Sequence, residues 1–304
     1  MSAVSEIIDR YAAKITGTLG VGFRDFDTGE EYYVNGDTVF PAASTFKVPI
    51  LISLFEQAEK GNLSLNSLHA LDAEDRAIGS GVLALLTPGI KLPLRDYATL
   101  MMVISDNTGT DVIYNTLGAD TIRATIQSMG LKETRCDISC DALVRLTYGI
   151  PMDISSKEAL RRIREDGYLP DPSLYENMAA PNDVSSPRDM ITMFSLIYRG
   201  QIVSKAACDE MMAIMERCQT NSRIPCHLPD KGPLKAKIAH KTGSLFTVAN
   251  DSGVISAAGR TYALSMFCFG YHATEEEKTQ VRENDLYDTL LADLSRDIFY
   301  AIHP

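Results

Sequence analysis

The chain has 304 residues, of which 45% are hydrophobic and 23% are charged, a balance that is ordinary for a soluble globular protein. Its formal net charge of -11 argues against a nucleic-acid partner and against an anionic membrane surface. The first ten residues lack the basic start and apolar core of a secretory signal, and no apolar run approaches membrane-spanning length. Unless a leader precedes this sequence, we expect a cytoplasmic protein with no membrane partner.

The first part of the chain predicts a helix followed by a pair of strands. Apolar residues recur at helical spacing over residues 3–15. Strand-like residues follow over 16–26 and resume over 31–34, with an Asp-Thr-Gly-Glu turn signal between them. We expect this antiparallel hairpin to lead into a helix that begins at Ser44 and continues as a largely apolar run to Phe55.

The middle of the chain predicts helices that are joined by loops. Helical spacing and end signals place these helices at residues 94–104, 111–117, 119–129, 156–165, 186–198 and 204–218. After Pro233 the pattern changes to that of strands, and the last part predicts strands at 236–240, 254–257 and 261–269 and a helix at 286–302.

These elements together predict a fold of the α/β plus all-α class. We expect an antiparallel β-sheet flanked by helices, with an inserted helical domain. Residues 1–60 and 202–304 are assigned to the α/β domain, and residues 61–201 to the all-helical domain. An active-site cleft is expected where the two domains meet, because such junctions commonly bind ligands.

Six cysteines are expected to be reduced thiols in a cytoplasmic protein: Cys136, Cys140, Cys208, Cys218, Cys226 and Cys268. Cys136 and Cys140 form a C-x3-C pair, which is not a common zinc spacing. Together with Cys226 and His227 this pair is a weak alternative as a metal site. We therefore expect buried thiols and neither a metal nor a cofactor.

Ser44 and Lys47 are three residues apart at the entrance of the first apolar helix, so on a helix they share one face. A serine hydroxyl is a poor nucleophile until a base takes its proton, and a desolvated lysine can be that base. A helix N-terminus also favours negative charge that develops near it. Ser and Lys are common residues, so about one such pair is expected by chance in a chain of this size.

Two further short motifs follow in order along the chain. Ser105-Asp106-Asn107 lies between two predicted helices, and Lys241-Thr242-Gly243 lies at the end of a predicted strand. With this order and placement the chain resembles the serine β-lactamase and penicillin-binding protein superfamily, and within it the class A β-lactamases. The resemblance covers nearly the whole chain and includes an omega-loop-like stretch from Asn177 to Asp183.

The resemblance implies that Ser44 attacks a substrate carbonyl to form an acyl-enzyme, and that Lys47 activates it directly or through water. It implies that Ser105 relays a proton to the leaving group and that Lys241 raises the local positive potential. The backbone N–H groups of Ser44 and Ser244 would form the oxyanion hole. Substrate-binding roles are implied for Asn107, Asn177, Thr242, Gly243 and Ser244. The implied substrate is a small molecule with a carboxylate and an amide or ester carbonyl.

One departure from the family pattern bears on the second half of the reaction. Class A β-lactamases carry a glutamate four residues before the omega-loop asparagine, where it activates the deacylating water, and here that position is Ser173. The segment between Asn107 and Asn177 is also longer than in that family, because it contains the helix expected at 156–165. Glu176, or Asp171 further back, is left as an alternative base.

We therefore expect a class A β-lactamase-like serine hydrolase that acts on a β-lactam or on another amide or ester, with weak deacylation. A cytoplasmic esterase or amidase of a non-β-lactam metabolite is an alternative, favoured by the missing glutamate and the missing signal. A non-catalytic penicillin-recognising protein is a further alternative, which the three retained motifs argue against. His240 is expected to be a packed or partly exposed histidine and not a catalytic one, because strand alternation points it away from Lys241.

Overall fold

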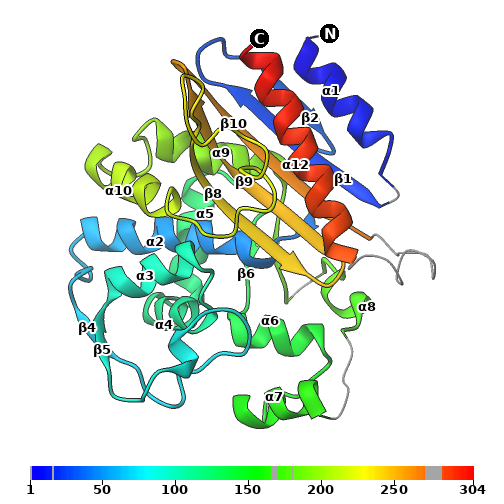
Figure 1. Cartoon of the computed structure of the whole chain (residues 1–304). Coiled ribbons are helices and arrows are strands. Elements are labelled where there is room, and N and C mark those ends of the chain that lie inside the picture. The colour runs from blue at the N-terminus through cyan, green and yellow to red at the C-terminus, as the bar shows by residue number, and fades with distance from the viewer. Residues whose placement is uncertain (1, 16, 166–169, 180, 271–282) are drawn as a thin grey trace.

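In a computed structural model of the protein, the structure describes residues 2–15, 17–165, 170–179, 181–270 and 283–304. A five-stranded antiparallel sheet forms one part of the molecule, and a group of helices lies beyond one end of it (Figure 1). The strand order is β2-β1-β10-β9-β8, so β8 is an edge strand. The strands are β1 (Thr18–Asp25), β2 (Glu31–Val34), β8 (Lys237–Leu245), β9 (Val248–Ala257) and β10 (Arg260–Phe269).

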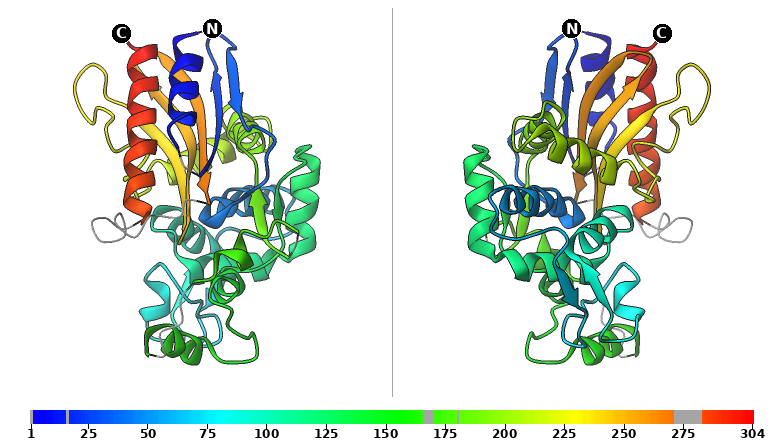
Figure 2. Two further views of the ribbon diagram at one scale, coloured as in Figure 1. Left: turned by 90° about the vertical axis from the view of Figure 1, so that its right-hand side faces the viewer. Right: turned by 90° about the vertical axis from the view of Figure 1, so that its left-hand side faces the viewer.

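Helices cover both faces of this sheet, as the two side views show (Figure 2). On one face lie α1 (Ala3–Ala12) and α12 (Glu283–Ile302), and their apolar residues share a buried cluster with Val21 and Phe23 of β1. On the other face lies α9 (Pro187–Tyr198), with α10 (Lys205–Met215) beside β8. Burying one apolar face of each helix against the sheet removes these side chains from water and stabilises the layers.

The helical part is arranged around α2 (Lys47–Glu59), whose first nine residues are all buried. Around it pack α3 (Leu94–Val103), α4 (Asn107–Leu117) and α5 (Ala119–Ser128). The remaining elements of this part are the 3₁₀ turns η1 (Ala43–Phe46) and η2 (Leu83–Leu85), the helices α6 (Cys140–Thr147), α7 (Ser156–Glu165) and α8 (Pro172–Tyr175), and the strands β3 (Phe40–Pro41), β4 (Leu68–Ala70), β5 (Lys91–Pro93), β6 (Arg135–Cys136) and β7 (Asp183–Ser185).

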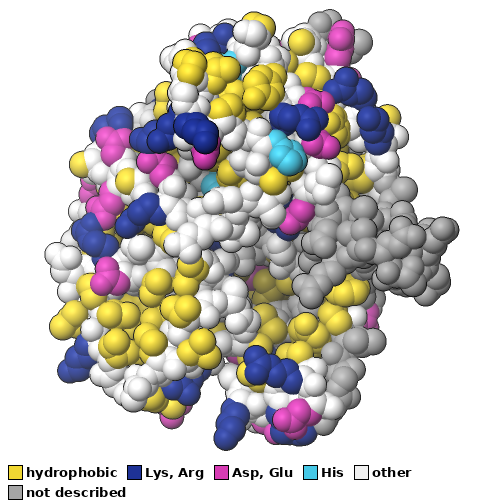
Figure 3. All heavy atoms as spheres, in the orientation of Figure 1, with side chains coloured by type: hydrophobic (Ala, Val, Ile, Leu, Met, Phe, Trp, Pro, Cys, Tyr) yellow, Lys and Arg dark blue, Asp and Glu magenta, His cyan; other side chains and the backbone are white. Residues whose placement is uncertain are grey.

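Apolar side chains gather on the surface of the helical part, over the region of β4 and β5 (Figure 3). The large apolar residues exposed in this region are Leu68, Val82, Leu85, Leu86 and Ile90. Among the helices that the structure describes, none combines the length and the apolar character that crossing a membrane requires.

The expected fold class, an antiparallel sheet flanked by helices with an added helical part, is confirmed. The domain limits stay a prediction, and α9, which falls in the range assigned to the helical domain, packs on the sheet. The helix expected from Asp111 begins at Asn107, because the Asp106 side chain caps it by accepting a hydrogen bond from the N–H of Gly109. Thr16, where the first strand was expected to begin, lies outside the described residues.

Two expected boundaries at the sheet also changed, and one of them is the start of the strand expected at 254–257, which begins at Val248 as β9. The strand expected at 236–240 continues through the Lys-Thr-Gly motif to Leu245 as β8, because that motif pairs with β9 along its whole length. Helix α6 and the short strands β3, β6 and β7 had no expected counterpart. Elements of two or three residues leave no periodicity in the sequence, so only their tertiary pairing defines them.

Candidate active site

Ser44 lies in the 3₁₀ turn η1, directly before α2, as expected for a helix entrance. The sheet edge comes close to this turn. A Cβ atom on Gly243 of β8 would lie 2.6 Å from the carbonyl oxygen of Ala42 and 3.0 Å from the backbone nitrogen of Ser44. Only glycine permits this approach. The third motif thereby places the edge of the sheet against the turn that carries the serine.

Lys47 extends from the start of α2 into a fully buried position. Its Nζ lies 2.8 Å from the carbonyl oxygen of Ser105, 2.8 Å from Oδ1 of Asn107 and 3.1 Å from Oγ of Ser105. Burial lowers the pKa of Lys47, whereas the neighbouring Cys140 thiol and the carboxylate of Asp111 act in the opposite direction. A lysine with a lowered pKa can accept a proton near neutral pH.

The hydroxyl of Ser105 lies between two lysines. Nζ of Lys241, on β8, is 3.1 Å from Ser105 Oγ and 2.8 Å from the carbonyl oxygen of Thr242. Burial, and next the charge of Lys47, lower the pKa of Lys241 to about 7. One hydroxyl within reach of two amines can accept a proton from one and donate its own onward, so it can relay a proton.

The loop that carries Ser105 is strained and firmly held. Ser105 has a φ of 57°, in the left-handed region that a side chain rarely adopts. Asp106 Oδ2 accepts hydrogen bonds from the N–H groups of Val82 at 2.6 Å and Leu83 at 2.9 Å. Ser80 Oγ, a residue that sequence reasoning missed, donates to the Ser105 carbonyl at 2.6 Å. The middle residue of the second motif therefore fixes the loop.

The most informative residue that the sequence did not indicate is Arg223. Its side chain is buried, and its guanidinium donates to Ser244 Oγ at 2.7 Å, to the Gly243 carbonyl at 2.9 Å and to the Asn250 carbonyl at 2.7 Å. Its Nε also donates to Asp288 at 2.6 Å. A guanidinium only donates, so Ser244 Oγ accepts from it and keeps its own proton free for an anionic ligand. No motif surrounds Arg223 in the sequence.

His240 is buried on β8, and its Nδ1 lies 2.9 Å from Oδ1 of Asp251. Burial alone would lower the pKa of His240, but the charge and hydrogen bond of Asp251 together raise it to about 10. The histidine is thus packed against a carboxylate, as expected, while its neighbour Lys241 contacts Ser105.

In the omega-loop-like stretch, the residues proposed to replace the missing glutamate already have partners. Ser173 is exposed, and its Oγ donates to Oδ1 of Asp171 at 2.7 Å. The carboxylate of Glu176 accepts a hydrogen bond from the hydroxyl of Thr247, in the turn between β8 and β9. Oδ1 of the exposed Asn177 accepts from the backbone N–H of Ala179 at 3.0 Å. These side chains bond to their own loop or to the β8–β9 turn.

The same stretch nevertheless packs directly against η1, the turn that carries Ser44. Tyr175 is fully buried in a small cluster with Ala43 and Val248. The buried amide of Asn182 donates to the carbonyls of Tyr175 at 2.8 Å and Asn177 at 3.1 Å. Asn182, rather than Asn177, is the asparagine that holds this stretch in shape, and a substrate-binding role for Asn177 stays a prediction.

The weak alternative of a metal site has no support in the part of the chain that the structure describes. No group of three or more His, Cys, Asp and Glu side chains there could hold a metal ion. Cys136 Sγ lies 3.7 Å from the carbonyl oxygen of Phe46, Cys140 is buried beside Lys47, and Cys226 is exposed.

Three comparisons with known proteins bear on this geometry. A β-lactamase of Pseudomonas aeruginosa, CARB-4, is 31% identical over 126 residues, and the match spans 41% of this chain and 43% of CARB-4, which is less than half of its length. A β-lactamase structure from Sphaerobacter thermophilus superposes with a TM-score of 0.77 at 25% identity, covering 99% of this chain and 97% of that one. An L158E mutant of PBP-A, solved as an acyl-enzyme complex with penicillin G, superposes with a TM-score of 0.75 at 27% identity, covering 99% and 96%.

A family model described as the beta-lactamase enzyme family matches residues 3–302, almost the whole chain. That match, the solved structures and the order of the three motifs agree with the resemblance seen in the sequence. The chain belongs to the beta-lactamase enzyme family.

Proposed function

We propose that this protein is a serine hydrolase that forms an acyl-enzyme on Ser44 with a β-lactam, or with another amide or ester that carries a carboxylate. The observation that carries the proposal is the meeting of Lys47 and Lys241 at the hydroxyl of Ser105, beside the turn that holds Ser44. The penicillin G acyl-enzyme of the related PBP-A mutant supports it.

In acylation, neutral Lys47 takes the proton of Ser44 directly or through a water molecule, and Oγ bonds to the substrate carbonyl carbon. The negative charge moves to the carbonyl oxygen, where the backbone N–H groups of Ser44 and Ser244 stabilise it. The carbon–nitrogen or carbon–oxygen bond then breaks. Ser105 donates its proton to the leaving atom and is reprotonated by one of the two lysines.

The substrate carboxylate is assigned to the end of this site formed by Thr242 and Ser244. The hydroxyl proton of Ser244 is free to donate, because the oxygen accepts from Arg223. Lys241, which lies on the same strand β8, adds positive charge near this end of the site. Charge-assisted hydrogen bonds of this kind favour an anionic substrate over its neutral ester.

Deacylation is proposed to be slow with penicillins. Hydrolysis of the acyl-enzyme requires a base that activates water, and Ser173 stands where the family has its glutamate. The carboxylate of Asp171 accepts a hydrogen bond from Ser173, and the carboxylate of Glu176 accepts one from Thr247. An ester or amide whose acyl group leaves more room for water is therefore the better candidate for turnover, which keeps a non-β-lactam esterase or amidase as the second proposed function.

The test is to incubate the protein with benzylpenicillin, and separately with a small activated ester, and to measure its intact mass over time. The proposal predicts an adduct that peptide mapping locates on Ser44 and that is absent in Ser44→Ala. No adduct with either reagent, or an adduct that survives Ser44→Ala, would contradict it.

A further inference from the structure

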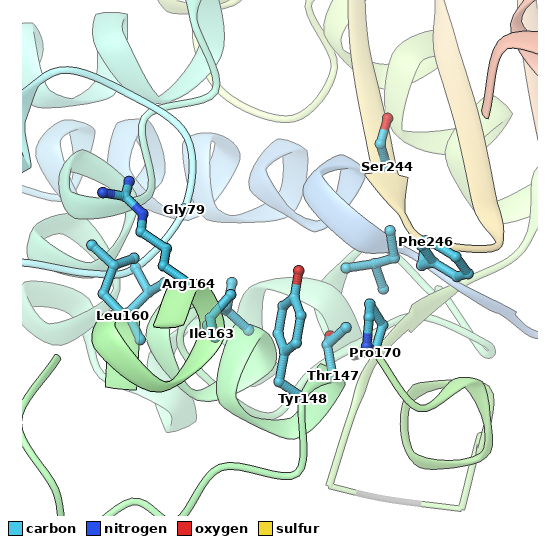
Figure 4. A pocket seen from close by; sticks show the side chains of 12 residues that line it. Gly79, Thr147, Tyr148, Leu160, Ile163, Arg164, Pro170, Ser244 and Phe246 are labelled. Carbon is cyan, nitrogen blue, oxygen red and sulfur yellow. The ribbon is translucent and has the colours of Figure 1, made fainter. Parts of the chain in front are cut away.

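A cavity opens beside the candidate site. It has a volume of about 440 Å³ and lies between α7, the end of α6 and the turn that joins β8 to β9 (Figure 4). Its lining includes Ser244, which follows Gly243 at the nucleophile turn, and Gly79, whose added Cβ would lie 2.3 Å from the Asn107 amide. The cavity therefore borders Ser244, the β8 residue whose N–H is assigned to the oxyanion hole.

The walls of this cavity are largely apolar. Leu160 and Ile163 of α7 lie across it from Phe246, and the Tyr148 hydroxyl points into it between them (Figure 4). Leu245 also lines the cavity. The side chain of Phe246 is 47% exposed, which is unusual for a large aromatic residue at a strand end. A concave apolar surface with few polar groups is typical of a small-molecule subsite.

The wall contributed by α7 is held in place. Ala159 is fully buried against Ile78 and Ile150, and Ser156 at the start of α7 accepts a hydrogen bond from Arg145 at 3.2 Å. Arg145 is itself buried. These contacts fix the helix, so this wall of the cavity is formed in advance of binding.

Arg164 lies at the end of the cavity away from Phe246 (Figure 4). Within the described residues no carboxylate pairs with Arg164. In contrast, Arg161 and Arg162 on the same helix both donate to Glu158, at 2.9 Å and 3.2 Å. An exposed guanidinium that pairs with no carboxylate of the described residues, at the far end of an apolar cavity, fits a ligand whose apolar body ends in a negative charge.

We propose that this cavity binds the acyl side chain of the substrate, with an apolar body between α7 and Phe246 and an anionic end at Arg164. The inference rests on the proposed acylation of Ser44 and names the class of acyl group that the site prefers. A phenyl ring bearing a carboxylate has the required chemistry, and such a group is small compared with the 440 Å³ cavity.

The experiment uses three thioesters of mercaptoacetic acid that differ only in the N-acyl group on glycine: acetyl, phenylacetyl and 4-carboxyphenylacetyl. All three offer the same carbonyl and the same leaving-group carboxylate to Ser44. The second-order rate of acylation is expected to be about tenfold higher for phenylacetyl than for acetyl, as one buried ring allows. A further gain of about threefold is expected for 4-carboxyphenylacetyl, because an exposed ion pair contributes little.

Two variants and one control locate the effect. Leu160→Ala should reduce the preference for phenylacetyl over acetyl at least threefold and leave the acetyl rate unchanged. Arg164→Gln should abolish only the gain from the second carboxylate, whereas the matched control Arg161→Gln on the same helix should retain it. Added salt should weaken that gain as well.

The outcomes separate this inference from the proposed function. If all three thioesters acylate Ser44 at equal rates, the subsite is overturned and the proposed function stands. If phenylacetyl is preferred over acetyl, but the second carboxylate adds no rate and Arg164→Gln changes nothing, the assignment of the anionic end is overturned. If none of the three acylates Ser44, the proposed function and the subsite both fail.

Discussion

Nζ of Lys47 lies 2.8 Å from Oδ1 of Asn107 in a fully buried contact that joins the first motif to the second. The amide of Asn107 is fixed in turn, because its Nδ2 donates to the Ile78 carbonyl at 2.8 Å. This amide orients the lysine that is proposed to take the proton of Ser44. The bond is therefore a direct target for mutation.

Asn107→Leu should lower the rate of acylation by about 100-fold, because Lys47 loses the acceptor that orients it. The free energy of unfolding should fall by about 1–3 kcal/mol, since Lys47 loses one of its three partners and the Ile78 carbonyl loses the amide that donates to it. The matched control is Thr108→Val, which removes a buried hydrogen bond to the N–H of Ala77 and leaves Lys47 untouched. Equal losses of acylation in both variants would assign Asn107 a purely structural role.

The lowered pKa of Lys241 gives a prediction for stability against pH. Its pKa is about 7 in the folded protein, whereas the ordinary pKa of a lysine is 10.5. Between these values the unfolded chain binds a proton that the folded protein does not, so the contribution of this group to the free energy of unfolding rises with pH. Below pH 7 both states are protonated, and the full cost of burying the cation is present.

Lys241→Met should therefore raise the free energy of unfolding at pH 6.5 by about 1–3 kcal/mol, with a gain that shrinks toward pH 10. Acylation should fall in the same variant, because Ser105 loses one of its two amines. Denaturant unfolding at a series of pH values measures the effect, and Lys241→Arg, which keeps the charge, serves as the control. A Met variant less stable than the parent at pH 6.5 would show that the buried charge is not destabilising.

Arg223 gives a prediction about substrate charge. Arg223→Lys removes the fork that bonds Ser244 and two carbonyls at once, so the Ser244 hydroxyl loses its orientation. The KM for a carboxylate-bearing ester should rise about tenfold, while the rate with its methyl ester stays within twofold. Arg188→Lys, at an exposed pair with Asp37, is the control. If activity with the carboxylate-bearing ester and activity with its methyl ester fall by the same factor, Arg223 only supports the fold.

Glu176 is tested as a replacement base by Glu176→Gln. Its carboxylate accepts a hydrogen bond from Thr247, and a glutamine oxygen can accept the same bond. The breakdown rate of the penicilloyl enzyme should therefore change by less than about twofold, as should that of the control Asp171→Asn. A fall of more than tenfold in Glu176→Gln alone would identify this residue as the base.

The sequence predicted the parts of the site that lie within short motifs. Lys47, Ser105 and Lys241 belong to three such segments, and their order along the chain was enough to predict that they meet. Arg223 could not be predicted in this way. Its partners are carbonyls and a hydroxyl 20 to 27 residues away, and a buried arginine among backbone acceptors leaves no periodic signal.

The omega-loop-like stretch shows the same limit for a different reason. The resemblance implied a substrate-binding role for Asn177, which is exposed, and it did not indicate Asn182, which is buried and holds this stretch in shape. Tyr175 determines this outcome, because its ring packs against Ala43 and its hydroxyl contacts Thr247. The conformation of a loop follows from such tertiary contacts, which the pattern of residues along the chain does not encode.

The central claim is that Ser44 acylates readily while hydrolysis of the penicilloyl ester lacks its usual base. Rapid-mixing mass spectrometry with excess benzylpenicillin measures both steps in one time course. The adduct on Ser44 is expected to approach full occupancy and then to decay at least 100-fold more slowly than it formed. Product release that keeps pace with acylation, with no accumulated adduct, would contradict the account.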